Sequence, residues 1–274
     1  MNYHLEMEWN RDHTLYPEFL QSPIKRGRGI GFSEKYKPWI HKRDVPSKGT
    51  SGSIGGVWSG REHWLLSTLE KAYFFELERM PTVVDIREQW PILDINRTIE
   101  LAAKFGVRHK TNIKTGYPEP YTVDFLVTER INGKIVYSAR SVKTPEDAAK
   151  VGTQKKLAIE HAWFTQYDTP WTNMVTGNYS NTLLDTLHFM REWYRNHYEP
   201  NRSAEAEFVR VFKKNYTTGA VLEELTQQCA KKLHIDHGLA VNRFRYCAWS
   251  NKIPLYVSEK LAMNEPVHLI LKPK

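Results

Sequence analysis

The most informative tract of this chain runs Tyr121-Thr-Val-Asp-Phe-Leu-Val-Thr-Glu-Arg-Ile-Asn-Gly-Lys-Ile-Val-Tyr-Ser-Ala-Arg-Ser-Val-Lys143. Two runs of alternating apolar and polar residues flank Asn132-Gly133, and Asn-Gly is the strongest short-range signal for a two-residue type I′ turn. Such a turn fixes the register of its two strands, with Ile131 opposite Lys134. The tract therefore predicts a β-hairpin.

The same register brings three polar side chains together at the base of the hairpin. Asp124 falls opposite Ser141, and Lys143 shares that face, diagonal to Asp124, because side chains alternate faces with a period of two. An ordinary hairpin with a polar outer face would show the same pattern, and one β-bulge would break the register. The pattern indicates a site only if a second acid comes from elsewhere in the chain.

Glu70 is the candidate for that second acid. A helix is predicted from Ser59 to about Met80, because Ser59-Gly-Arg-Glu62 has the spacing of a capping box and Pro81 follows the expected end. The apolar stripe of this helix would be Leu66, Leu69, Tyr73, Phe74 and Leu77. Glu70 interrupts the stripe, and a buried carboxylate is costly unless it is paired or metal-bound. A partner lysine or arginine, or a boundary position, would also explain it.

Glu70, Asp124 and Lys143 together predict a site for metal-dependent hydrolysis of a phosphodiester. Mg²⁺ takes hard oxygen ligands and keeps several waters, so two carboxylates and a backbone carbonyl suffice. The carbonyl of Val142 lies between the site residues on the strand and would be the third ligand. Lys143 would orient or help deprotonate the attacking water and stabilise charge on the phosphate. The expected ion is Mg²⁺, with Mn²⁺ as a substitute.

The elements around the hairpin predict an α/β domain with a mixed sheet flanked by helices. Thr82–Trp90 is an expected strand, and Thr169–Thr176 is another. A helix is expected to start at Thr144-Pro-Glu-Asp147, since proline suits the first position and acids suit the first turn. It would restart after Gly152 and run to about Gln166. Its inner face would consist of Leu157, Ala158, His161 and Phe164.

The remainder of the chain is expected to be mostly helical and winged-helix-like. Helices are predicted at 178–197, 204–215, 218–233 and 238–251, followed by short extended runs at 253–257 and 266–271. A helix-turn-helix with a two-stranded end suggests a winged helix. Its second helix carries Asn242, Arg243, Arg245 and Tyr246, which suit DNA, although such units also dock proteins. The expected domains are 1–177, catalytic, with a basic arm over about 1–58, and 178–274.

Charge and composition favour an anionic partner and a chain outside membranes. The net charge is +8 and the pI is about 9.3, which suits nucleic acid first and a membrane surface second. The stretch from Lys25 to Lys37 would contact phosphate or form a solvated surface arm, and Pro46–Gly56 would be a loop. Cys229 and Cys247 are expected to be buried thiols in a reducing cytoplasm. The first residues lack an apolar segment and no run of about 18 apolar residues occurs, so neither secretion nor membrane spanning is expected.

These residues resemble a known family of nucleases. The arrangement of Glu70, Asp124 and Lys143 resembles the PD-(D/E)xK restriction-endonuclease-like fold, and within it the TnsA endonuclease subunits of heteromeric Tn-seven-type transposases. The resemblance weakens after about Gln166, although a helical C-terminal part fits the family. The matching segments are Arg26–Gly29, Tyr36–Trp39, Val45–Ser47, Leu66–Glu70, Asp85–Pro91, Thr122–Val127 and Val142-Lys143. Of these, Asp85-Ile-Arg-Glu-Gln-Trp-Pro91 is more distinctive than the catalytic residues.

The resemblance implies that Glu70, Asp124 and Lys143 are the active-site acids and lysine. The position two before the lysine, acidic in most of the fold and often glutamine in TnsA, is Ser141 here. Serine hydrogen-bonds a metal-bound water but is a poor ligand, which puts an acidic role there in doubt. Glu160, on the following helix, is a candidate to help hold a second ion. The histidines at 63, 109 and 161 show no metal-ligand spacing and are expected to be structural or on the surface.

The resemblance also implies a place in DNA transposition. The subunit would nick the 5′ ends of a transposon in double-stranded DNA while a TnsB-like transposase cuts and joins the 3′ ends. Its C-terminal domain would contact a TnsC-like AAA ATPase, and the protein would lie in the bacterial cytoplasm, at the nucleoid when active. Two other hypotheses remain open. One is a stand-alone restriction or repair nuclease of the same fold. The other is a non-catalytic adaptor between DNA and an ATPase, with Ser141 as a sign of decay.

Overall fold

The computed structural model describes residues 7–41, 52–177 and 179–270. The chain divides into two compact units. The described residues up to Gly177 form the first unit, apart from Arg79–Pro81, which group with the second unit from Tyr179 onward. Each unit is built around its own set of buried residues and is described separately.

A four-stranded mixed sheet forms the centre of the first unit, in the order β3-β4-β5-β6. Its strands are β3 (Val83–Ile92), β4 (Tyr121–Ile131), β5 (Lys134–Lys143) and β6 (Trp171–Val175). The first three are antiparallel neighbours, and β6 pairs with β5 in parallel. The sheet and its helices confirm the predicted α/β class.

The hairpin of β4 and β5 has the predicted turn and register. Ile131 pairs with Lys134, and the same register continues to Phe125 opposite Arg140. Asn132 and Gly133 have φ of 51° and 79°, the two positive values that a type I′ turn requires. One further step in this register sets Asp124 level with Ser141, as the sequence predicts.

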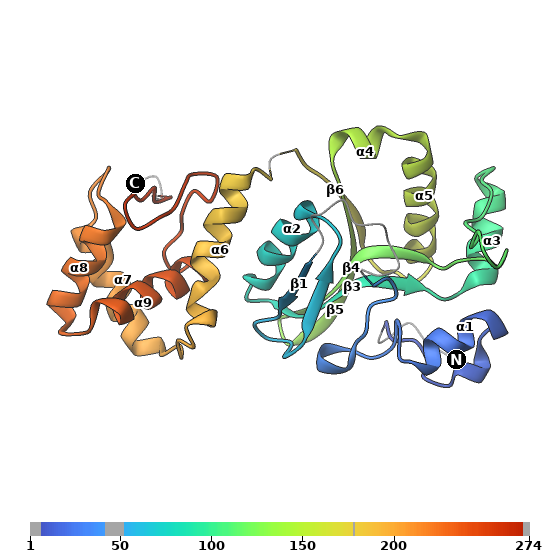
Figure 1. The fold of residues 1–274 in the computed structure, drawn as a ribbon, viewed down its shortest axis with the longest axis horizontal. Helices are drawn as coiled ribbons and strands as arrows, with labels where there is room; N and C mark the ends of the chain where they lie inside the picture. Colours follow the sequence, from blue (N-terminus) through green and yellow to red (C-terminus); the bar gives the residue numbers. More distant parts are fainter. Residues whose placement is uncertain (1–6, 42–51, 178, 271–274) are drawn as a thin grey trace. The chain divides into compact units, whose positions relative to one another are not determined.

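Helices cover the sheet on both sides (Figure 1). They are α2 (Thr68–Glu78), α3 (Ile95–Lys104), α4 (Pro145–Ala149) and α5 (Val151–Thr165). The first of these packs against β3 and β5, whereas α5 packs against β4 and β6 with α3 beside it. A core cluster joins Trp90 of β3 and Val123 of β4 to Trp163 and Phe164 of α5. The sheet is thereby fixed between two apolar layers.

The predicted helix start at Ser59 is wrong. Residues Glu62–Leu65 form strand β2, which pairs with β1 (Gly52–Gly55), and α2 begins only at Thr68. The Ser59 hydroxyl lies 2.7 Å from the ring of His63 instead of capping a helix. The loop predicted at Pro46–Gly56 is accordingly a strand over its last part, and Pro46–Ser51 lies outside the described residues.

The inner face predicted for α5 also needs correction. The helix begins at Val151 rather than after Gly152, and His161 is exposed, while Ile159, Glu160 and Trp163 are buried. Leu157 and Phe164 are buried as predicted. The start of the preceding helix is confirmed, because the Thr144 side chain accepts a hydrogen bond from the backbone of Asp147.

The N-terminal segment is packed along the edge strand β3. It contains α1 (Glu18–Lys25) and two 3₁₀ turns, His13–Leu15 and Ser33–Lys35. The indole of Trp9 donates to the carbonyl of Pro91 at 2.7 Å, the Tyr36 hydroxyl to Glu88 at 2.9 Å and the Trp39 amide to Gln89 at 3.2 Å. The segment therefore covers polar groups that an edge strand would otherwise expose.

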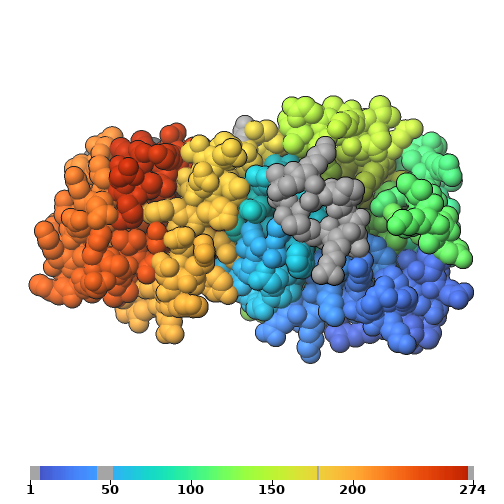
Figure 2. All heavy atoms as spheres, in the orientation of Figure 1, coloured from blue at the N-terminus to red at the C-terminus, as the bar shows by residue number. Residues whose placement is uncertain are grey.

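Several cations of this segment remain at the surface. Lys25, Arg26, Lys35 and Lys37 are exposed, and Figure 2 shows the segment on the surface of the first unit. The described part of the predicted arm is thus a folded element, whose Leu20, Ile24 and Ile30 form a small core with Leu93 and Ile95 beyond β3. Its basic side chains still point outward.

The second unit is helical. It contains α6 (Asn181–Arg195), α7 (Arg202–Asn215), α8 (Leu222–Leu233) and α9 (His237–Trp249). The predicted extended runs meet through a single bridge, Leu255 with Leu269. Both cysteines are buried and unpaired. In the part of the chain that the structure describes, none of the helices has the length and apolar character needed to cross a membrane.

The predicted DNA-reading residues of α9 are half-buried against other parts of the same unit. Asn242 accepts a hydrogen bond from the side chain of Asn196, and Arg245 lies 3.5 Å from Glu192 of α6. The guanidinium of Arg245 also lies 4.6 Å from the ring centre of Phe189. These contacts hold α9 to α6, and DNA reading by α9 stays a prediction.

Candidate active site

The base of the hairpin brings together the residues that the sequence predicts there. The Lys143 ammonium donates to Asp124 Oδ2 at 2.5 Å and to the carbonyl of Val142 at 3.0 Å. The amide of Val142 donates to the same oxygen of Asp124 at 2.7 Å. Asp124 is 6% exposed. Because two donors share one carboxylate oxygen, Asp124 is held in a fixed orientation at the end of the two strands.

Glu70 reaches the same region from the first turn of α2. The Ser67 hydroxyl accepts a hydrogen bond from the Glu70 amide at 3.1 Å, as an N-cap does. The Glu70 carboxylate turns back and accepts from the Leu66 amide at 3.0 Å and the Ser67 hydroxyl at 3.3 Å. Ser67-Thr-Leu-Glu70 therefore has the capping-box spacing that actually starts the helix.

The electrostatics of Glu70 show that it lies in the field of Asp124. Burial and the negative charge of Asp124 raise the pKa of Glu70 to about 7, against the opposing effects of its hydrogen bonds and of Lys143. The Lys143 ammonium pairs with Asp124 and the Lys156 ammonium with Glu160, which leaves a region of negative potential at ionised Glu70. Such a region favours the binding of a cation.

The residues present fit a hard divalent cation. Glu70 and Asp124 supply carboxylate oxygens, and Val142 supplies a backbone carbonyl beside them, all of the ligand type that Mg²⁺ prefers. Within the described ranges, no group of three or more His, Cys, Asp or Glu side chains has the geometry of a metal site. The protein's share of a coordination shell here would consist of two acids and a carbonyl, with waters completing it.

Ser141 faces the interior rather than the cluster's open side. It is buried, and its hydroxyl donates to Glu160 Oε2 at 2.7 Å. Glu160 is completely buried on α5, and burial raises its pKa despite the nearby Lys156 and Ser141. Its other oxygen, Oε1, lies 3.3 Å from the Lys156 ammonium. The structure thus places Glu160 behind Ser141, on helix α5.

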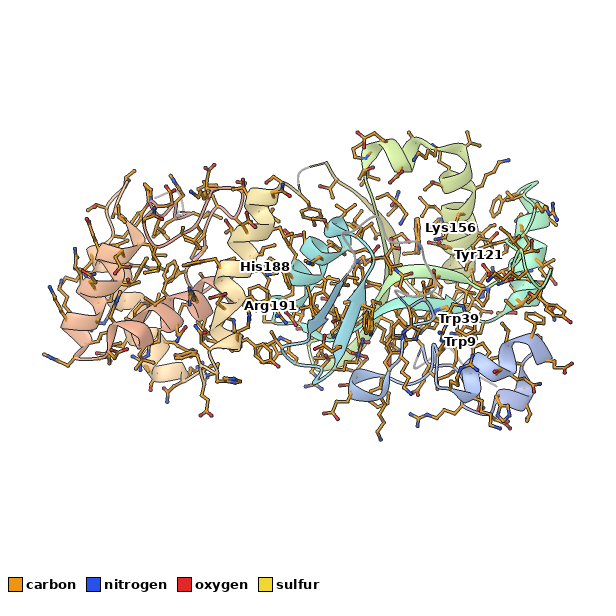
Figure 3. All side chains as sticks on the ribbon, in the orientation of Figure 1. Trp9, Trp39, Tyr121, Lys156, His188 and Arg191 are labelled. Atoms are coloured by element: carbon orange, nitrogen blue, oxygen red, sulfur yellow. The ribbon has the colours of Figure 1, made fainter. Side chains whose placement is uncertain are left out.

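Lys156 is a second cation in this neighbourhood that the sequence reasoning missed. It projects from α5 beside Tyr121 at the start of β4 (Figure 3). Burial opposes its charge, but Glu160, Asp124 and Glu70 together raise its pKa. The spacing of Lys156 and Glu160, four residues apart on one helix, was the signal available in the sequence.

Gln89 is a further residue that the sequence reasoning did not single out. Its side-chain amide donates to Glu70 Oε2 at 3.4 Å, and its oxygen accepts from the hydroxyl of Thr122 at 3.5 Å. The available signal was its place in the distinctive segment Asp85–Pro91. Residues Asp85–Pro91 thus contact the N-terminal segment through their backbone and Glu70 through the side chain of Gln89.

The three histidines lie apart from the hairpin cluster. His63 is buried between Ser59 and Glu88, with its Nδ1 2.9 Å from the Glu88 carboxylate. His109 bonds the hydroxyl of Thr98, and His161 is exposed beside the ring of Trp171. Their surroundings match structural and surface positions.

Comparison with known proteins shows which family this domain resembles. Residues 80–176 match the family model described as the TnsA-like endonuclease N-terminal domain. This part of the chain is therefore similar to a TnsA-like endonuclease domain. The matched range of the TnsA-like domain includes Asp124, Ser141, Lys143 and Glu160, whereas Glu70 precedes it.

A curated relative extends the likeness. The chain is 37% identical over 148 residues to the transposon Tn7 transposition protein TnsA of Escherichia coli, a match that covers 54% of this chain and 53% of that protein. The alignment therefore spans about half the length of each protein.

Proposed function

We propose that this protein is a Mg²⁺-dependent DNA endonuclease subunit of a Tn7-type transposase, which nicks the 5′ ends of a transposon during cut-and-paste transposition. The observation that carries the proposal is the meeting of Glu70, from helix α2, with Asp124 and Lys143 of the hairpin. The TnsA-like endonuclease domain and the printed function of its relative, transposition, support the same conclusion.

In this proposal Glu70, Asp124 and the Val142 carbonyl hold the ion. When bound, Mg²⁺ supplies a positive charge that lowers the pKa of a water and offsets charge on the phosphate. Both carboxylates need to be ionised for activity, because a protonated carboxyl is a poor ligand for a metal ion.

Lys143 carries the positive charge that belongs to the chain itself. Its ammonium now donates to Asp124 and to Val142, the same oxygen atoms that would ligate the ion. When those oxygens serve as ligands, the three N–H donors of Lys143 become free to bind a non-bridging phosphate oxygen. In the hydrolysis, a water oxygen bonds to phosphorus and the bond to the departing sugar oxygen breaks. The water loses a proton, and the departing oxygen gains one.

The partners in this proposal are double-stranded DNA at the transposon ends, a TnsB-like transposase and a TnsC-like AAA ATPase. The exposed cations Lys25, Arg26, Lys35 and Lys37 and the net charge of +8 support contact with DNA. The second unit is the proposed ATPase contact. The proposed location is the bacterial cytoplasm, at the nucleoid when the transposase is active.

Asp124→Ala tests the proposal in a reaction reconstituted with the partner transposase, ATPase and transposon-end DNA. Nicking at the 5′ ends is expected to fall by at least about 10³-fold, because a ligand and the anchor of Lys143 are lost together. Joining of the 3′ ends by the partner is expected to continue. Glu100→Ala, which changes an exposed acid of α3 in the first unit, is the matched control.

Three outcomes separate the alternatives. Undiminished 5′ nicking by Asp124→Ala contradicts the proposed site. Cleavage of DNA by the purified wild-type protein alone, dependent on Asp124, indicates a stand-alone nuclease. Absence of 5′ nicking by the wild type in Mg²⁺ or Mn²⁺, with DNA and ATPase binding retained, indicates an adaptor.

A further inference from the structure

Gln89 has a backbone conformation that its side chain does not favour. It lies in strand β3 with φ of 48°, in the left-handed region, and it is 3% exposed. Glycine adopts this region without a steric penalty, whereas a residue with a Cβ and a long side chain does so rarely. A glutamine at such a position indicates that its side chain has a use that offsets the strain.

The side chain of Gln89 reaches one acid of the candidate site, Glu70, from a strand position level with the other, Asp124. In the register of β3 and β4, Glu88 pairs with Phe125 and Trp90 with Val123, so Gln89 lies level with Asp124. Its amide nitrogen reaches Glu70 Oε2 at 3.4 Å, while Thr122 holds its amide oxygen at 3.5 Å. Glu70 is thus held from its own helix by Leu66 and Ser67, and from the sheet by Gln89.

The N-terminal segment holds the backbone at this point. Trp39 donates its amide to the carbonyl of Gln89 itself, and Tyr36 and Trp9 donate to the carbonyls of Glu88 and Pro91 on either side. Three anchors around one strained residue leave little freedom for its backbone to relax. They keep the Gln89 amide directed at Glu70.

We infer that Gln89 is a positioning residue that orients the Glu70 carboxylate beside Asp124; this inference rests on the proposed endonuclease function. An amide suits the task better than lysine or arginine would. It donates a hydrogen bond to the carboxylate without neutralising it, so the charge of Glu70 stays available for a cation. The N-terminal segment acts on the site indirectly, by holding Gln89.

The inference is tested with Gln89→Gly and Gln89→Met in the reconstituted nicking reaction. The glycine relieves the strain and removes the amide, while the methionine keeps a side chain of similar length without a donor. Both variants are expected to lower kcat for 5′ nicking by at least about tenfold, with KM for transposon-end DNA unchanged. Both are also expected to raise the Mg²⁺ concentration at half-maximal rate. The glycine variant is expected to melt at or above the wild-type temperature.

Controls separate this inference from the proposed function. If wild-type protein nicks and Asp124→Ala does not, but both Gln89 variants keep the wild-type kcat and Mg²⁺ dependence, the positioning role is wrong and the endonuclease function stands. If Gln89→Met keeps the wild-type kcat while Gln89→Gly lowers it, the side chain acts by filling space rather than by donating a hydrogen bond. That result overturns the inference. A wild-type protein that never nicks overturns both.

Discussion

Two buried glutamates of the first unit, Glu70 and Glu88, have opposite electrostatic surroundings. Glu88 is completely buried and accepts hydrogen bonds from the Arg61 guanidinium at 2.6 and 2.8 Å and from the Trp64 amide at 3.1 Å, with His63 at 2.9 Å. Burial alone would raise its pKa, but Arg61 and His63 outweigh burial and lower the pKa to about 2. Glu70, 8% exposed, accepts from uncharged groups and lies near Asp124, and its pKa is raised to about 7.

The difference separates a carboxylate that stabilises the fold from one that, in the proposed function, binds a cation. Glu88 has its cations built into the chain, and its charge ties β2 and the loop before it to β3. Glu70 has neutral donors and a neighbouring acid, so its ionised form costs stability in the folded protein. A site that binds a cation needs that second arrangement, because a built-in arginine would compete with the ion.

Glu88→Gln is expected to have the largest effect on stability. The amide cannot neutralise the Arg61 guanidinium, whose side chain is 7% exposed. Removing one partner of a buried ion pair typically costs about 3–5 kcal/mol in the free energy of unfolding. Urea denaturation at neutral pH measures the loss. Glu100→Gln, at a surface pair with Arg97, is the control, with an expected change within about 0.5 kcal/mol.

The pH dependence of this loss provides an internal check. A folded-state pKa of about 2 for Glu88 lies below the ordinary value, so its stabilisation is present above about pH 4.5 and disappears as pH falls towards 2. The gap between wild type and Glu88→Gln is therefore expected to narrow in that interval. A gap that stays constant down to about pH 3 would show that the cost is one of packing rather than charge.

Glu70→Gln is expected to change the free energy of unfolding in the opposite direction, towards higher stability. Because the folded-state pKa of Glu70 is raised to about 7, the folded protein retains a proton that the unfolded chain releases, and stability falls as pH rises between about 4.5 and 7. Without divalent ions, the amide variant is expected to be more stable than wild type by about 1–3 kcal/mol at about pH 8 and equal to it at about pH 4. Urea denaturation at both pH values measures this. A less stable variant at the higher pH would show that Glu70 is a structural residue like Glu88.

Local chemistry explains what the sequence predicts well. Asn132-Gly133 sets its turn without help from distant residues, and the register of the hairpin follows from the turn, so Asp124, Ser141 and Lys143 are located correctly from sequence. Residues whose positions depend on contacts between elements are different. Gln89 lies beside Glu70, and Lys156 beside Tyr121, only because the sheet and two helices pack together.

The start of helix α2 shows how a distant contact overrides a local signal. Ser59-Gly-Arg-Glu62 and Ser67-Thr-Leu-Glu70 have the same capping-box spacing, so the sequence alone gives no reason to choose the second. The choice depends on Glu88, which binds Arg61 and His63 of the first stretch and holds that stretch as a turn and strand. The contacts of Glu88 with Arg61 and His63 therefore explain why the predicted helix start at Ser59 is wrong.

Ser67→Ala and Ser59→Ala are expected to have the smallest effects on stability. They test whether a hydroxyl near each glutamate influences the nicking reaction. Each removes one buried or half-buried hydroxyl, at the cap of α2 or beside His63, and each is expected to cost about 1 kcal/mol in the free energy of unfolding. Only Ser67 donates to Glu70, and that hydrogen bond lowers the pKa of Glu70. The acidic limb of the pH–rate profile for 5′ nicking should therefore move to higher pH in Ser67→Ala and stay in place in Ser59→Ala. Equal profiles would mean that the Ser67 hydroxyl caps the helix without influencing the carboxylate, and Glu70 would owe its orientation to Leu66 and Gln89.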